Sequence, residues 1–134
     1  MALSDSLISF WELEEASGTR VDAVTVSGND LTDNNTVTQN PGKVGQAAQF
    51  TAANSESLSR VSNSSLQLGN IDFTLCAWAY FDSIPSATRK IITKRATANR
   101  EYELQFSFAA DSFEFVINDG LTTNVRTITV DETL

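Results

Sequence analysis

Histidine is absent from this chain of 134 residues, and cysteine occurs only once, as Cys76. Without histidine, the chain cannot build a Ser-His-Asp or Cys-His catalytic site, or a zinc site with imidazole ligands. A single cysteine can form neither an internal disulfide nor a thiolate metal site. Most familiar hydrolases are therefore excluded, and so is a fold held together by internal disulfides.

Positive charge is also scarce, because nine lysines and arginines stand against 17 aspartates and glutamates and leave a net charge of −8. The only local basic group consists of Lys94, Arg95 and Arg100, which we interpret as a solvated turn between strands. Nucleic-acid binding requires a clustered basic surface that neutralises phosphates. We therefore expect no nucleic-acid partner.

Long apolar runs are missing as well. No segment approaches the roughly 18 apolar residues that a membrane-spanning helix needs. Residues 1–5 show neither the basic nor the apolar region of a secretory signal peptide. We expect no membrane insertion and no export signal in this chain.

Hydrophobic residues nevertheless make up 41% of the chain, and eight residues are phenylalanine, which is sufficient for a packed core. The apolar pattern of residues 7–13 predicts a largely buried strand. Residues 21–40 are polar and predict a long surface loop with a short strand at its middle, and residues 47–50 predict another short strand. No helix of three turns is expected.

The strongest strand signal covers residues 72–81. Alternation places one set of side chains on one face, namely Phe73, Leu75, Ala77, Ala79 and Phe81. The other face receives Thr74, Cys76, Trp78 and Tyr80. Since both faces carry apolar residues, we expect a strand near the middle of a sheet, with both faces at least partly covered.

Four further strands are expected in the second half of the chain, at residues 90–93, 102–108, 112–117 and 122–130. Turn residues separate them, and the sequence Asn118-Asp119-Gly120 predicts a hairpin turn because Asp-Gly tolerates the positive φ that tight turns demand. This rhythm predicts an antiparallel sandwich.

Four segments then form a recognisable series: LISFWELEEASG at 7–18, SGN at 27–29, GKVGQAAQF at 42–50 and DFTLCAW at 72–78. In their order and spacing they resemble the laminin G-like (LamG-like) domains of the concanavalin A-like lectin and glucanase superfamily, in its bacterial and viral branch. The resemblance implies an all-β fold, a two-sheet antiparallel jelly-roll sandwich, formed by residues 1–134 as a single domain.

The chain departs from this family at its C-terminus. Members of the family usually continue past the position of Leu134 with a Trp-containing strand, a hairpin and a closing strand that pairs with the first one. We therefore expect either a truncated copy or a chain whose sheets are completed by self-association or by a partner chain. An open sheet edge is costly unless something covers it.

Carbohydrate-cleaving relatives carry a closely spaced Glu-x-Asp-x-x-Glu on one strand, and this chain lacks that motif. Glu101 and Glu103 share a strand face by spacing, but no third carboxylate joins them. We interpret them as solvated strand ends and expect no enzymatic activity.

The superfamily often holds a calcium ion at the rim of the sheets, and the resemblance implies a structural Ca²⁺ here. The candidate ligands are Asp22, Asn29 and Asp30, in a loop that also contains Asp33. Oxygen ligands of this kind suit Ca²⁺. The same residues are also common turn formers that bond to their own backbone, and this alternative stays open.

Sandwich lectins bind sugars by stacking aromatic rings on them, and the candidate rings here are Trp78, Tyr80 and Tyr102. The alternative is that the aromatic residues belong to the core; family position and alternation favour this for Trp11. We favour burial for Trp78 and Tyr80 too, and expect Cys76 on the same face to be a small buried residue.

The resemblance implies a non-catalytic binding module that recognises glycans or a cell-surface polymer, a step that rests on fold analogy. The alternative is a structural, decoration or adhesion protein of a virus particle or surface assembly that acts through protein–protein contacts. This alternative is favoured because we expect the closing strands to be missing and expect no export signal in this chain. The location stays open, because this chain shows no signal peptide, and an extracellular or virion-surface location is favoured.

Overall fold

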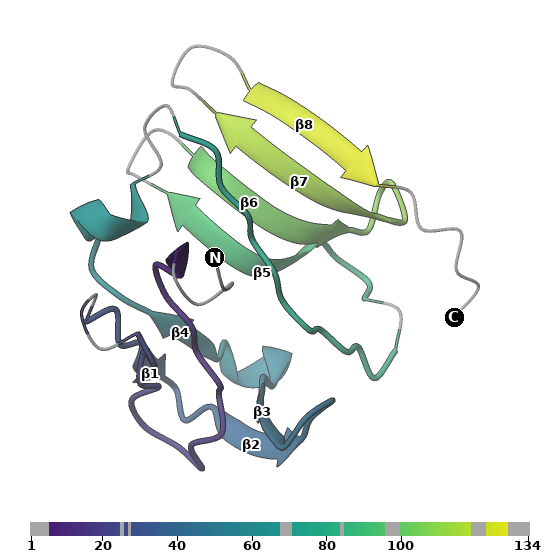
Figure 1. Cartoon of the computed structure of the whole chain (residues 1–134). Coiled ribbons are helices and arrows are strands. Elements are labelled where there is room, and N and C mark those ends of the chain that lie inside the picture. Colours follow the sequence, from purple (N-terminus) through teal and green to yellow (C-terminus); the bar gives the residue numbers. More distant parts are fainter. Residues whose placement is uncertain are drawn as a thin grey trace. The chain divides into compact units, whose positions relative to one another are not determined.

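The computed structural model describes residues 6–24, 26, 28–67, 71–83, 85–95, 100–118 and 123–128 (Figure 1). The chain divides into two compact units, Met1–Gln67 and Leu68–Leu134. All strand pairs are antiparallel, and helical structure in the described residues is limited to short 3-10 turns such as η2 (Ala52–Asn54) and η3 (Ser64–Leu66). The expected all-β, antiparallel class is confirmed. Among these residues no helix has the length and apolarity needed to cross a bilayer.

The first unit contains four short strands: β1 (Thr32–Asn34), β2 (Thr38–Pro41), β3 (Gln46–Gln49) and β4 (Ser57–Ser59). They form two small sheets, β1 with β4 and β2 with β3. The strand expected at residues 47–50 is confirmed as β3. In the turn between β2 and β3, Gly42 donates its N–H to the carbonyl of Gly45 at 2.9 Å, and Gly45 adopts a φ of +60°. That backbone conformation favours glycine.

The strand predicted over residues 7–13 is wrong. The only pairing there is an isolated bridge between Trp11 and Asp22, and Leu13 adopts a φ of +61°, which interrupts an extended chain. The Phe10 N–H donates to the side-chain oxygen Oδ1 of Asp22 at 2.9 Å. The Phe10 carbonyl accepts the Ala23 N–H at 2.8 Å, so one side chain and one backbone group of a loop, and not a neighbouring strand, pair with Phe10.

The second unit contains one four-stranded sheet, whose strands follow one another in chain order (Figure 1). They are β5 (Arg89–Arg95), β6 (Arg100–Ser107), β7 (Ser112–Asn118) and β8 (Thr123–Ile128). The four strands expected in this half of the chain are therefore confirmed. The predicted hairpin turn falls on Asp119 and Gly120, which lie outside the described residues, although β7 and β8 do pair as a hairpin requires.

The two faces of this sheet differ in chemistry. In the β6–β7 register Tyr102 lies opposite Ile117 and Phe106 opposite Phe113, so one face is apolar. Between them, on the other face, lie Glu103, Gln105 and Ser107, together with Ser112 and Glu114 of β7. Tyr102 and Phe106 are only 5% and 6% exposed, and the Phe106 ring lies 5.6 Å from that of Phe113, so the apolar face carries an aromatic cluster.

Residues 71–83 cross this apolar face as a long trace without strand pairing (Figure 1). The Phe73 ring lies 6.0 Å from that of Tyr102 and 5.7 Å from that of Phe115, while the Phe81 ring lies 5.5 Å from that of Phe106. The predicted alternation is therefore correct in placing Phe73 and Phe81 on the same face of the segment. The predicted central strand is wrong, because side chains and not backbone hydrogen bonds attach this segment to the sheet.

Candidate functional site

The side of residues 72–81 that points away from the sheet carries the most exposed aromatic side chains of the second unit. Trp78 is 83% exposed and Tyr80 is 86% exposed, and Cys76 beside them is also exposed. The expected burial of these three side chains is wrong. Side chains two residues apart in an extended chain lie on the same side, about 7 Å apart. The two rings can therefore contact one ligand together.

Tyr102, the third candidate ring, does not join them. It lies on the apolar face of β6, where its ring contacts Phe73, and burial, with a smaller contribution from Glu101, raises the pKa of its hydroxyl. Tyr102 therefore packs against the side of residues 72–81 that faces the sheet, whereas Trp78 and Tyr80 are exposed to solvent.

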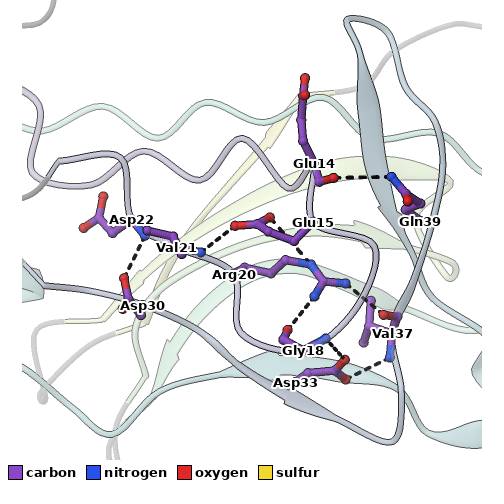
Figure 2. A network of polar contacts seen from close by, with 10 residues as sticks. All are labelled: Glu14, Glu15, Gly18, Arg20, Val21, Asp22, Asp30, Asp33, Val37 and Gln39. Carbon is purple, nitrogen blue, oxygen red and sulfur yellow. Dashed lines mark hydrogen bonds and ion pairs between the residues drawn. The ribbon is translucent and has the colours of Figure 1, made fainter.

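The candidate metal ligands lie in one loop of the first unit, but their oxygens are engaged with the backbone. Asp22 is 3% exposed, and its Oδ1 accepts the N–H groups of Phe10 and Val24, both at 2.9 Å. Asp30 Oδ1 accepts the Asp22 N–H at 2.9 Å (Figure 2). The described residues contain no group of three or more Asp, Glu, Cys or His side chains that could hold a metal ion.

Asn29 has a similar internal role. Its side-chain nitrogen donates to the hydroxyls of Ser9 at 2.7 Å and Ser65 at 3.0 Å, and its Oδ1 accepts from Asn63 at 3.1 Å. Its carbonyl accepts the indole N–H of Trp11 at 2.7 Å. Asn29 is fully buried, and these bonds join three segments that are far apart in the sequence.

Arg20 is the centre of a second polar network, shown in Figure 2, that the sequence did not reveal. Its side chain is fully buried, and its guanidinium donates to the carbonyls of Gly18 at 2.5 Å and Val37 at 2.8 Å. Asp33 accepts the N–H groups of the same two residues, at 2.9 and 2.8 Å, and Glu15 Oε2 lies 3.9 Å from Arg20 Nε. An isolated arginine in a polar stretch gives no sequence signal of such burial.

Asp33 gives this network a dependence on pH. The Val37 N–H bond, more than any other contact, lowers the pKa of Asp33 below its ordinary value of 3.8. A lowered pKa in the folded state adds stability above the ordinary pKa, and that stability is lost as pH falls through the lowered value. Between about pH 5 and about pH 2, the urea midpoint of Asp33→Asn should fall less steeply than that of the wild type.

The matched control for this titration is Glu12→Gln, which removes an exposed carboxylate of the same unit. Its midpoint should follow the wild-type curve across the same range of pH. If Asp33→Asn also follows that curve, the Asp33 bonds do not contribute to acid sensitivity.

The polar face of the four-stranded sheet carries a network that the sequence also did not reveal. Glu103 is 1% exposed; its Oε2 lies 2.9 Å from Lys90 Nζ and its Oε1 accepts the Thr93 hydroxyl at 3.1 Å. Gln105 also accepts from Lys90 and donates to Glu114 Oε2 at 2.6 Å. The expectation of a solvated Glu103 is therefore wrong, because cross-strand partners compensate its charge.

Lys94 of the basic group also forms an ion pair. Lys94 was expected in a solvated turn, but its side chain is 12% exposed and its Nζ lies 2.5 Å from Glu101 Oε1. Opposite charges on neighbouring strands thus pair with one another. This leaves Trp78 and Tyr80 as the candidate residues that present free ring faces.

Comparison of the chain with protein-family models, with curated proteins and with solved structures finds no match. Of the three candidate ring residues, Trp78 and Tyr80 are the exposed ones.

Proposed function

We propose that this protein is a non-catalytic binding module that recognises glycans or a cell-surface polymer through Trp78 and Tyr80. The observation that carries the proposal is the exposure of both rings, 83% and 86%, on one side of residues 72–81. Exposed aromatic rings are costly to hold in water, and they are typical of binding surfaces when they lie together.

The attachment of this segment supports a stacking role. Phe73 and Phe81 hold its two ends against the rings of β6 and β7. A ring pair whose backbone is already positioned loses less conformational freedom on binding, and this favours affinity. Sugar rings offer apolar C–H faces of a size that matches an indole or phenol ring, and hydroxyl groups at their edges for polar contacts.

The same arrangement supports the jelly-roll part of the proposal. A segment of alternating side chains lying over the apolar face of a sheet is what one strand of a second sheet would supply in a sandwich. We propose a LamG-like sandwich domain over residues 1–134, without a structural Ca²⁺ at Asp22, Asn29 and Asp30, because the side-chain oxygens of all three already accept hydrogen bonds within the protein.

Substitution of Trp78 by alanine tests the glycan proposal. We expect Trp78→Ala and Tyr80→Ala each to weaken glycan binding at least about tenfold, because aromatic contacts dominate such surfaces. Both side chains are exposed, so thermal stability should stay close to that of the wild type. A glycan array read with and without calcium identifies the ligand, and calorimetric titration of that ligand measures the loss.

Phe108→Ala is the matched control, because Phe108 is also exposed in the second unit, at 51%. Its glycan affinity should equal that of the wild type. An array without any saturable ligand, in either calcium condition, would contradict the proposal.

The second candidate function is assembly through protein–protein contacts, as in a decoration or adhesion protein of a virus particle or surface assembly. A different observation favours it: residues 72–81 form no backbone hydrogen bond with the described part of the chain. Extended backbone that has no partner strand can pair with a strand from another chain.

A further inference from the structure

Within the part of the chain that the structure describes, neither edge of the backbone of residues 72–81 is paired with another strand. In an extended chain the N–H and C=O groups of alternate residues point to opposite edges, and each edge can pair with a neighbouring strand. The segment contains no proline, so no donor is missing along either edge. Half of its residues are of types that favour strands, namely Phe73, Thr74, Trp78, Tyr80 and Phe81.

The segment is also held in place for pairing. Phe73 and Phe81 contact the sheet eight residues apart, through rings of β6 and β7. A strand that adds to a positioned edge gains main-chain hydrogen bonds, and alternate side chains give the specificity. An edge fixed at both ends loses less entropy on binding than a free one.

Charge determines which strand fits. Asp72 is the first residue of the segment and Asp82 follows its last residue, in a bend, and both are exposed. Neither of them forms an ion pair within the part of the chain that the structure describes. No charged residue lies between them, so the charge pattern of this edge is one carboxylate at each end.

A second copy of the chain is a poor occupant of this edge. Antiparallel pairing of two copies about Ala77 brings Phe73 opposite Phe81, but it also brings Asp72 of each copy opposite Asp82 of the other. Like charges directly opposite each other on neighbouring strands are destabilising. The same register would therefore be favoured only for a partner with positive charge at both ends.

We propose that residues 72–82 accept an extended strand of a partner protein that carries a lysine or arginine at each end, about ten residues apart, with alternating apolar side chains between them. The proposal rests on the second candidate function and names the partner's chemistry. It uses the edges of the segment, whereas glycan stacking uses the ring faces of Trp78 and Tyr80.

The test uses the full chain and synthetic peptides labelled with fluorescein. The first peptide is Lys-Val-Thr-Val-Thr-Val-Thr-Val-Thr-Val-Lys, the second replaces both lysines with glutamate, and the third is the first peptide with its five central amides N-methylated. Anisotropy should show saturable binding of the first peptide, and binding about tenfold weaker for the second. N-methylation removes the donors and should weaken binding at least tenfold.

The protein variant is Asp72→Asn combined with Asp82→Asn, whose carboxylates are exposed, so the fold should be retained. The double variant should bind the lysine and glutamate peptides equally. Its matched control is Asp111→Asn, an exposed aspartate of the same unit, which should keep the preference for lysine.

Each negative result contradicts a different part of the proposal. Equal binding of the lysine and glutamate peptides to the wild type overturns the proposed requirement for a lysine or arginine at each end of the partner strand. It does not contradict protein–protein contact at this segment. Equal binding of the N-methylated peptide overturns strand addition. Absence of binding by all three peptides overturns both. Light scattering over a dilution series, and cross-linking of Cys76 with a short bismaleimide, test for pairing of two copies. A dimer that persists on dilution and is cross-linked through Cys76 of both copies would show that a second copy, and not a different protein, pairs with this segment.

Discussion

Arg20→Ala should destabilise the first unit by about 3 kcal/mol, the largest effect that we expect from any polar substitution. The substitution leaves the carbonyls of Gly18 and Val37 without the guanidinium donors that they now have. It also removes the positive charge beside Asp33 and Glu15. Buried acceptors that lose their donors cost more than the bonds themselves contribute.

Urea unfolding followed by the fluorescence of Trp11, in a Trp78→Phe background, measures this effect. Trp11 belongs to the first unit, where its indole is bonded to Asn29. The matched control is Arg60→Ala: Arg60 also donates to a carbonyl, that of Gly28, but at a bond exposed to solvent. The control should cost less than about 1 kcal/mol, and equal losses for both variants would contradict a special role for Arg20.

Phe106→Ala should destabilise the second unit by about 3 to 4 kcal/mol. Phe106 is 6% exposed, and its ring lies 5.5 Å from that of Phe81 and 5.6 Å from that of Phe113. Removing it opens a cavity under the attached end of residues 72–81. Loss of this attachment should also weaken binding of any ligand to that segment.

Thermal and urea unfolding, followed by circular dichroism, measure the change in stability. Phe108→Ala is the control, because the same residue type two positions along the chain is 51% exposed in the turn after β6. It should cost less than about 1 kcal/mol. A Phe106→Ala variant as stable as this control would show that the ring cluster does not hold the second unit together.

The second unit could be predicted from the sequence because its signals are local. Alternation along residues 102–107 and 112–117 places apolar and polar side chains on opposite faces, and the turn residues between them set the hairpin order. The same alternation predicted correctly that Phe73 and Phe81 share a face. It could not predict whether residues 72–81 pair with a neighbour, because alternation does not encode the partner of a strand.

The first unit could not be predicted in the same way. Its structure depends on polar bonds between residues far apart in the sequence, such as Asn29 with Ser65 and Arg20 with Val37. Single polar residues of this kind look the same in sequence whether they are solvated or buried. The apolar run of residues 7–13 therefore predicted a strand, whereas Asp22 took the backbone donor of Phe10 that a strand would have used.

The residue types of the candidate site could be named from the sequence, but their exposure could not be predicted. Trp78 and Tyr80 were identified by type and spacing, but their burial was favoured because a strand rich in apolar residues is normally covered on both faces. The structure exposes them because only one face of residues 72–81 meets the sheet. Tyr102 was grouped with them by residue type alone, although its parity on β6 places it with Phe106 on the apolar face.

β5 is an outer strand of the four-stranded sheet, and its register with β6 shifts between Lys90 and Ile92 and again between Lys94 and Arg95. Bulges and lysines on an outer strand prevent other chains from adding to it, and so protect a protein against aggregation. Residues 72–81 have neither bulge nor lysine. Aggregation of chains without a partner should therefore begin at residues 72–81 and not at β5, so the segment suited to binding is also the segment that most needs to be covered.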